Sequence, residues 1–159
     1  MESNGTSNFE KFYSKALHFL SFRPRSEKEL RDYLKKKNAD DLIIRKIINS
    51  LIENKFLDDK EFAKWFIEQR TTFKPKAVRI IKSELKRKGI TEEIIDDSEL
   101  PAVNDLENAM VLARKRIGRY KNEDAKKKYE KMVRFLSSRG FDWDTIKEVI
   151  DRILPKEYN

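Results

Sequence analysis

The chain has 159 residues, and its 36 Lys and Arg against 28 Asp and Glu leave a formal net charge of +8. Charged residues make up 40% and apolar residues 38%, which allows only a thin core and predicts a small basic protein of one domain or a short array of units. The absence of cysteine and the presence of one histidine exclude disulfides, thiol nucleophiles, and Cys- and His-based metal sites.

The amino-terminal segment MESNGTSN has neither the basic region nor the apolar stretch of a signal peptide. No apolar run in the chain reaches the length that spanning a bilayer requires. We therefore expect a cytoplasmic protein with no membrane contact, whose residues 1–8 are disordered.

The first two predicted elements are helices. Apolar residues at helical spacing predict a helix over residues 9–21. Ser26 and Glu29 have the spacing of a capping box, which predicts the start of a second helix over residues 26–37. One face of that helix would carry Leu30, Tyr33 and Leu34.

A repeat of 51 residues runs through the chain, because Leu34, Leu85 and Leu136 begin matching segments: LKKKNAD, LKRKGIT and LSSRGFD. Each copy predicts the end of one helix at a residue that tolerates left-handed backbone, then an apolar residue, then a cap for the next helix. These positions are Asn38, Gly89 and Gly140 for the turn, Ala39, Ile90 and Phe141 for the apolar residue, and Asp40, Thr91 and Asp142 for the cap.

Further helices are predicted over residues 58–70 and 105–120, and Asp58 with Glu61 has capping-box spacing. The stretch 96–104 lacks periodicity and should be the loosest joint. The fold class is therefore all-α: three tandem three-helix repeats in an elongated, curved array. The boundaries are a disordered 1–8, repeats over 9–54, 55–98 and 105–155, and a linker over 99–104.

The sequence offers few patterns that indicate catalysis or metal binding. The acid pairs Asp40–Asp41, Asp58–Asp59 and Glu92–Glu93 all fall at predicted helix starts, where capping explains them. No phosphate-binding glycine loop exists, and His18 has no second ligand or nucleophile beside it. Packing is the simpler explanation for the aromatic residues, among them Trp65 and Trp143. We therefore predict no catalytic residue, no cofactor and no metal, and hence a protein that is not an enzyme.

The basic residues are more informative. Two predicted helices carry three cations on one face at the same register, which could follow regularly spaced phosphates or a repetitive acidic surface. The third repeat lacks that stripe and concentrates its charge elsewhere, and a solvated charged face remains the alternative explanation. The candidate residues for binding a partner or DNA are Lys28, Arg31 and Lys35; Arg79, Lys82 and Lys86; and Arg114, Lys115, Arg116, Arg119, Lys121, Lys127, Lys131 and Arg134.

Four segments in this order resemble the RecX family of recombination regulators: RPRSEKELRDYLKKK, FLDDKEFAKWFIEQR, IIKSELKRKGI and FLSSRGFDWDTI. The resemblance covers residues from about 9 to 154, and Ala77 stands where the family often has glycine. The matching positions are Arg25, Ser26, Glu29 and Leu30, then Asp59, Phe62 and Ala63, then Glu84, Leu85, Lys88 and Gly89, and lastly Arg139, Gly140 and Phe141.

The resemblance implies a fold of three tandem three-helix repeats and a non-enzymatic protein that binds the RecA recombinase filament. It also implies inhibition of the recombinase's DNA-dependent ATPase, strand exchange and co-protease activities, as part of DNA repair and the SOS response. The protein would occupy the helical groove of the filament and would also bind single- or double-stranded DNA, without sequence preference. We expect it to act as a monomer.

Two other classes stay open at this point. A three-helix unit with a turn at Asn38 or Gly89 also resembles helix-turn-helix geometry, which would make the protein a regulator that reads duplex DNA. The mostly lysine stripes favour phosphate or acidic protein contacts over base readout. A nuclease would need convergent carboxylates, and the sequence offers acid pairs only at helix starts.

Overall fold

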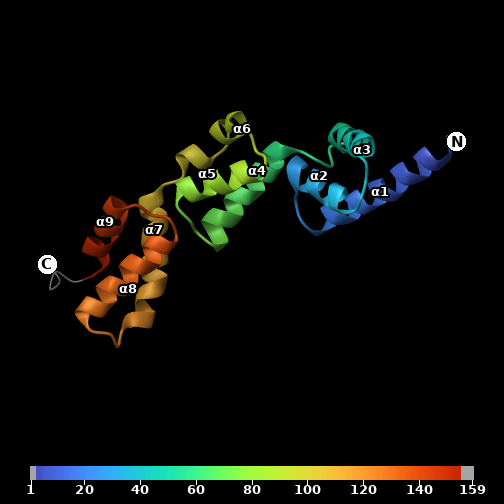
Figure 1. Ribbon diagram of the computed structural model, residues 1–159. Coiled ribbons are helices and arrows are strands. Elements are labelled where there is room, and N and C mark those ends of the chain that lie inside the picture. Colours follow the sequence, from blue (N-terminus) through green and yellow to red (C-terminus); the bar gives the residue numbers. More distant parts are fainter. Residues whose placement is uncertain (1–2, 155–159) are drawn as a thin grey trace. The chain divides into compact units, whose positions relative to one another are not determined.

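The computed structural model describes residues 3–154, with side chains from Ser7 onward. Over these residues the chain forms nine α-helices, one π-helix and two 3-10 helices, and no strand (Figure 1). The all-helical prediction is confirmed. The α-helices are α1 Ser3–Phe22, α2 Glu27–Lys36, α3 Asp41–Glu53, α4 Asp59–Glu68, α5 Val78–Arg87, α6 Glu92–Asp97, α7 Asp105–Ile117, α8 Ala125–Ser138 and α9 Trp143–Ile153.

The contacts divide the chain into two compact units. The first comprises residues 1–66 and 85–98, and the second comprises residues 67–84 and 99–159. The division therefore passes through α4 and α5, so that each of these helices contributes to both units.

Helix α1 begins at Ser3, six residues before the predicted start at Phe9. Residues 3–8, which the sequence predicts to be disordered, are therefore helical, while Met1 and Glu2 lie outside the described residues. Among the described residues, no helix is long and apolar enough to cross a membrane.

In the first unit α1, α2 and α3 pack against one another around a buried apolar cluster. Helix α2 begins with the predicted capping box: the Ser26 hydroxyl accepts from the Glu29 amide at 3.1 Å, and Glu29 accepts from the Ser26 amide at 3.2 Å. The buried cluster includes Phe12, Ala16, Leu30, Leu34, Ile44, Ile47, Ile48 and Leu51.

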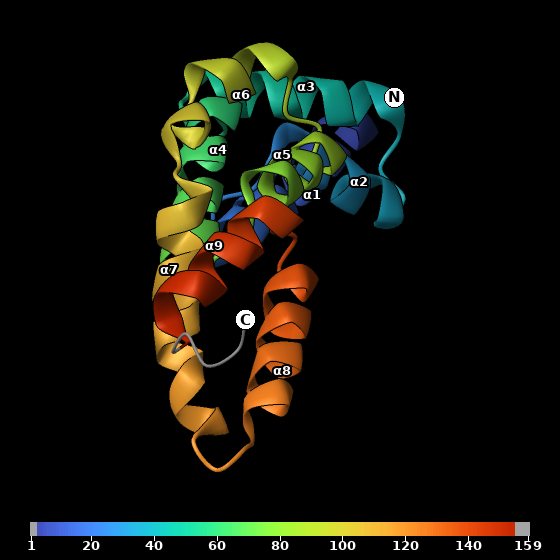
Figure 2. The same cartoon turned by 90° about the vertical axis from the view of Figure 1, so that its left-hand side faces the viewer.

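In the second unit α7, α8 and α9 form a second three-helix bundle, in which both views show α8 beside α7 (Figures 1 and 2). The predicted helix over 105–120 is α7 followed by the 3-10 helix Gly118–Tyr120. The core of this bundle includes Ala109, Ala113, Met132, Leu136, Phe141, Ile146 and Val149.

The three predicted turns are present in the backbone. Asn38, Gly89 and Gly140 have φ values of 68°, 81° and 89°, so all three are left-handed. The caps that follow them are also confirmed, since Asp40, Thr91 and Asp142 each accept a hydrogen bond from an amide three residues further on. Lys55 is a further left-handed residue, at φ 61°, which the repeat did not predict.

The helix predicted over 58–70 differs from the observed one at both ends. The observed helix α4 begins at Asp59, one residue later than predicted, and Asp58 accepts a hydrogen bond from the Lys60 amide at 2.9 Å. At the other end α4 stops at Glu68 and continues as the π-helix Gln69–Phe73. The Thr71 hydroxyl donates to the Ile67 carbonyl at 2.8 Å, a side-chain bond that competes with the backbone ladder where the helix widens.

Two repeat junctions, each inside one unit, share the same two contacts. In the first unit Gly89 lies against Lys28 at the start of α2, where an added Cβ would come within 2.7 Å of the Lys28 Cβ. In the second unit Gly140 lies against Ile80 at the start of α5 in the same manner. The turn of one repeat thus packs on the second helix of the repeat before it.

A carboxylate completes each junction. Asp59 accepts a hydrogen bond from the Glu27 amide at 2.8 Å, and Asp105 accepts one from the Val78 amide at 2.9 Å. Burial raises the pKa of both carboxyl groups, although these hydrogen bonds act in the opposite direction. Asp59 is therefore structural, as the sequence suggested, but it caps α2 rather than its own helix.

The segment 99–104 is not a bare linker. It contains the 3-10 helix Leu100–Ala102, and the Leu100 side chain is buried. Asn104 then caps α7 by accepting from the Glu107 amide. Apolar burial and a side-chain cap therefore order the stretch that lacks periodicity in the sequence.

Candidate partner-binding surfaces

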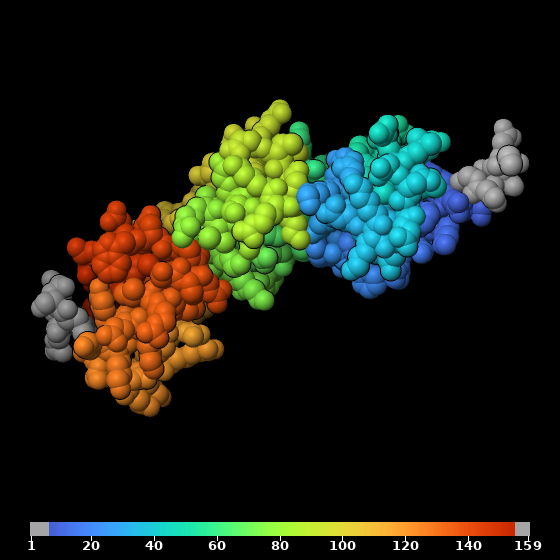
Figure 3. Space-filling model, viewed as in Figure 1, coloured from blue at the N-terminus to red at the C-terminus, as the bar shows by residue number. Residues whose placement is uncertain are grey.

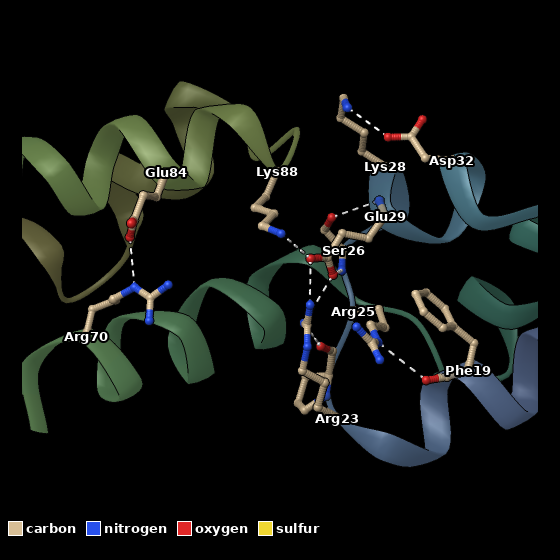
Figure 4. Close-up of polar contacts among 11 residues, drawn as sticks. Phe19, Arg23, Arg25, Ser26, Lys28, Glu29, Asp32, Arg70, Glu84 and Lys88 are labelled. Atoms are coloured by element: carbon tan, nitrogen blue, oxygen red, sulfur yellow. Dashed lines mark hydrogen bonds and ion pairs between the residues drawn. The ribbon is translucent and has the colours of Figure 1, made fainter. Parts of the chain in front are cut away.

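The α2 stripe consists of Lys28, Arg31 and Lys35, spaced to share one face of the helix. Lys28 is paired with Asp32 at 2.9 Å (Figure 4), and Arg31 lies 3.7 Å from Glu27. Lys35 is exposed and makes no side-chain hydrogen bond or ion pair with any residue that the structure describes. Exposed pairs of this kind are weak, so the whole stripe stays available to an acidic partner.

The α5 stripe consists of Arg79, Lys82 and Lys86, and part of it serves the fold. Arg79 donates from Nε to the Gly140 carbonyl at 2.7 Å, which holds the second repeat junction. Lys82 is half-buried and Lys86 pairs with Glu92 at 2.8 Å. The stripe therefore differs from a simple exposed row of cations.

The remaining candidates lie on and between α7 and α8. We define the hairpin-end cluster as Arg114, Lys115, Arg119 and Lys121, which surround the end of α7 and the 3-10 helix after it. All four are exposed and make no side-chain hydrogen bond or ion pair within the described part of the chain. The segment that joins α7 to α8, orange in Figure 3, lies at the surface of its unit.

Two neighbours of that cluster have structural roles. Arg116 donates to the Tyr120 hydroxyl at 3.1 Å and lies over the Phe135 ring, 4.7 Å from its centroid. Lys131 pairs with Glu123. The last two candidates, Lys127 and Arg134, are exposed on α8. Cations at the end of α7 also suit the negative end of its dipole, which supplies a structural reason for some of this charge.

An ionic cluster that the sequence did not predict centres on Glu29 in the first unit. Arg23 binds the Glu29 carboxylate through both terminal nitrogens, at 2.9 and 3.2 Å, and Lys88 approaches it to 2.7 Å (Figure 4). The Arg23 guanidinium also lies 5.4 Å from the centroid of the Trp65 ring. In the sequence, the RPR segment before α2 was the only signal for this ionic cluster. Lys88 is far away in the sequence and joins the cluster only through the tertiary fold.

Burial by itself would raise the pKa of Glu29, but the hydrogen bonds from Arg23 and Lys88 outweigh it and lower that pKa. A lowered pKa means that Glu29 stabilises the fold above its unfolded pKa and loses this contribution as the pH falls through the folded value. The stability of the first unit should therefore decrease on acidification below about pH 5.

The expected result of Glu29→Gln is a smaller decrease of the unfolding free energy between pH 6 and pH 3, with a loss of about 1 kcal/mol at neutral pH. Urea unfolding of both proteins at several pH values measures this. Glu84, whose pKa Lys76 and Arg70 lower against the effect of burial, is intact in both proteins, so the difference isolates Glu29. Parallel curves for the two proteins would contradict the assigned role.

The remaining residues that the sequence singled out are His18 and the aromatic side chains. His18 is exposed, with its ring against Phe22. The residues that the structure describes include no group of three or more His, Asp or Glu side chains that could hold a metal. Phe62 and Phe141 are buried, as the packing interpretation predicts, whereas Trp143 is 52% exposed, so packing does not account for it.

Over the described residues the protein is an all-helical chain of three-helix bundles with exposed basic side chains. Three family models match the chain in order: the first, second and third three-helix domains of RecX, over residues 13–51, 58–98 and 104–150. The chain belongs to the RecX family.

Individual relatives agree with this assignment. Regulatory protein RecX of Geobacillus sp. (strain WCH70) is 37% identical over 93% of this chain and 54% of its own length. Regulatory protein RecX of Clostridioides difficile (strain 630) is 37% identical over 89% of this chain and 67% of its own length. The chain thus spans about half to two thirds of the curated relatives it matches.

Two solved structures have the same fold. The crystal structure of RecX from Lactobacillus salivarius matches with a TM-score of 0.74 at 30% identity, covering 93% of this chain and 97% of that one. A crystal structure of regulatory protein RecX matches with a TM-score of 0.75 at 26% identity, covering 93% and 75% of the two chains. The prediction of three three-helix repeats is confirmed by the family domains and by these structures.

Proposed function

We propose that this protein binds the RecA recombinase filament and inhibits its ATPase, strand-exchange and co-protease activities. Membership of a family of regulatory proteins carries the proposal. The charged surfaces of α2 and of the hairpin-end cluster support it physically, because exposed cations can contact an acidic protein surface or phosphates. The protein would act in the cytoplasm as a monomer, through surface contacts and without a covalent step.

We also propose that the protein binds single- or double-stranded DNA without sequence preference. Lysine and arginine that contact phosphates add affinity on every sequence alike and make it strongly dependent on salt. The exposed cations around the end of α7 are suited to this because nearby carboxylates do not pair with them in the described part of the chain.

The test of the proposed function is a titration of pre-assembled recombinase filaments on single-stranded DNA, with ATP hydrolysis as the readout over a range of salt concentrations. Inhibition at concentrations well below those that coat the DNA is the expected result. A DNA-only binding assay runs beside it. Failure to inhibit, combined with tight and sequence-selective duplex binding, would favour a helix-turn-helix-like DNA-binding regulator instead.

Reversing two charges of the hairpin-end cluster, Arg119→Glu with Lys121→Glu, should weaken DNA binding by about tenfold and lower the salt slope by about two. Helix content should not change because both side chains are exposed. Fluorescence anisotropy with labelled DNA at several salt concentrations measures both quantities.

The matched control is Arg45→Glu with Lys46→Glu, which makes the same change in net charge on the exposed side of α3. If both doubly substituted proteins lose equal affinity, net charge and not the cluster determines binding. The α5 stripe is less suitable for this test, since reversing Arg79 would also remove its hydrogen bond to Gly140.

A further inference from the structure

A groove of about 750 Å³ lies in the first unit, between the end of α1 with the loop to α2 on one side and the turn from α3 into α4 on the other. Its lining combines cations, carboxylates and the aromatic rings of Phe56 and Phe62. The lining residues used below are Arg25, Lys55, Phe56, Asp58 and Glu61.

Arg25 contacts Phe19 twice and leaves its two terminal nitrogens without a partner among the described residues. Its guanidinium lies 3.9 Å from the centroid of the Phe19 ring, and its Nε donates to the Phe19 carbonyl (Figure 4). The Phe19 ring is itself stacked on Tyr33, with centroids 4.1 Å apart. The two terminal nitrogens of Arg25 make no hydrogen bond or ion pair with any residue that the structure describes.

The Glu29 carboxylate acts on the charge of Arg25 but makes no hydrogen bond or ion pair with it. Burial and the neighbouring charge of Arg23 lower the pKa of Arg25, while the charge of Glu29 acts in the opposite direction. The nearby Glu29 carboxylate is already bound by Arg23 and Lys88. A second carboxylate placed at the terminal nitrogens of Arg25 would therefore be stabilised.

The opposite wall supplies a second cation and an apolar surface. Lys55 sits in left-handed backbone at φ 61° and makes no side-chain hydrogen bond or ion pair with the described residues. Phe56, the next residue, is 59% exposed, although a large aromatic ring usually finds burial. Aromatic residues and arginine are enriched at protein interfaces, so Phe56 together with Arg25 suits a recognition site.

We infer that this groove binds an extended acidic segment of a protein partner, with one carboxylate at Arg25, another at Lys55, and an apolar side chain against Phe56. Asp58 and Glu61 line the same groove, and they would repel an unbroken row of phosphates. A peptide can instead place its few carboxylates at the cations and uncharged residues beside Asp58 and Glu61. The inference deepens the proposed function if the partner is the recombinase, but its chemistry is testable without the recombinase.

The first probe is the peptide acetyl-GDELFG-amide, added to the full ¹⁵N-labelled chain while the Arg25 side-chain Nε–H resonance is followed. Saturable shifts of this resonance and of the Phe56 amide are expected. The counterpart acetyl-GKKLFG-amide, which replaces both carboxylates, should produce no saturable shift. Absence of saturation with the acidic peptide, or equal shifts with both peptides, would overturn the inference.

The variants Lys55→Asn and Phe56→Ala should each lower the affinity for the acidic peptide by about tenfold. Asn tolerates left-handed backbone and Phe56 is exposed, so both proteins should keep their helix content. The matched controls are Lys46→Gln and Phe73→Ala, which remove an exposed lysine and an exposed phenylalanine elsewhere. Equal losses in variants and controls would overturn the inference.

The third probe is oligothymidylate. If it shifts the resonances of Arg25 and Phe56, and if the variants abolish these shifts, then the groove binds single-stranded nucleic acid and the inference of a peptide is overturned. The filament ATPase assay separates the two proposals. Suppose that a groove variant no longer binds the peptide and that the wild-type chain does not inhibit the filament. This result would support peptide binding in the groove and overturn the proposed function. Full filament inhibition without any peptide binding would do the reverse.

Discussion

Replacing Gly140 with alanine is expected to lower the free energy of unfolding by about 2 to 5 kcal/mol. Gly140 has φ 89°, a conformation that costs an L-residue about 1 to 2 kcal/mol. The added Cβ would also overlap the Ile80 Cγ1 atom and lie 3.5 Å from the Ala77 Cβ, at the start of α5. Overpacking of this kind costs about 1 to 3 kcal/mol.

The loss should be large because neighbouring bonds keep the turn from moving away. The Ala77 amide donates to the Arg139 carbonyl at 3.0 Å, and Arg79 donates to the Gly140 carbonyl at 2.7 Å. Relieving the overlap would stretch both bonds. Urea unfolding followed by circular dichroism measures the loss.

Gly118→Ala is the matched control for this prediction. Gly118 has helical backbone, φ −59° and ψ −27°, and an added Cβ would meet nothing within 4 Å. Alanine is favoured over glycine in helical backbone by up to about 1 kcal/mol, so this variant should be as stable as the wild type or more so. Equal destabilisation by the two substitutions would mean that left-handed backbone and the Ile80 contact do not decide the cost at Gly140.

Leu85→Ala should cost about 2 to 5 kcal/mol of unfolding free energy. Leu85 is the second of the three leucines that begin the repeated segments, and Leu34, Leu85 and Leu136 are all fully buried. Truncation removes buried apolar area and leaves a cavity that a helical core fills only in part. The measurement is again the urea midpoint and slope.

Leu42→Ala is the control for the core substitution, since Leu42 is 59% exposed on α3. Its expected cost is below about 0.5 kcal/mol. A wild-type midpoint for Leu85→Ala, or equal losses at both positions, would contradict the assignment of the repeated leucines to the core.

The candidate surfaces divide into residues that the sequence could nominate and contacts that it could not. Helical spacing placed Lys28 and Lys35 on one face of α2, and this spacing follows from the periodicity of the helix alone. The same spacing nominated Arg79, yet the fold uses its guanidinium at the Gly140 carbonyl. Which of the fourteen candidates contact a partner stays a prediction.

Local order could be predicted from the sequence because caps and turns depend on residues three or four positions apart. The Ser26–Glu29 capping box, the left-handed Asn38, Gly89 and Gly140, and the cap at Asp142 all follow from such short-range chemistry. The 51-residue repeat then required three similar units. For this reason the all-helical class and the three family domains could be predicted from the sequence.

Only the tertiary structure decided which distant groups meet. Asp59 caps α2 instead of α4, Lys88 joins Arg23 on Glu29, and Arg25 faces a groove with its terminal nitrogens unused by the described residues. These contacts depend on how one repeat packs against the next, and a carboxylate in the sequence carries no mark of its distant partner. Short-range stereochemistry therefore determined the helices and turns, whereas packing between repeats determined which charges are satisfied and which remain open to a partner.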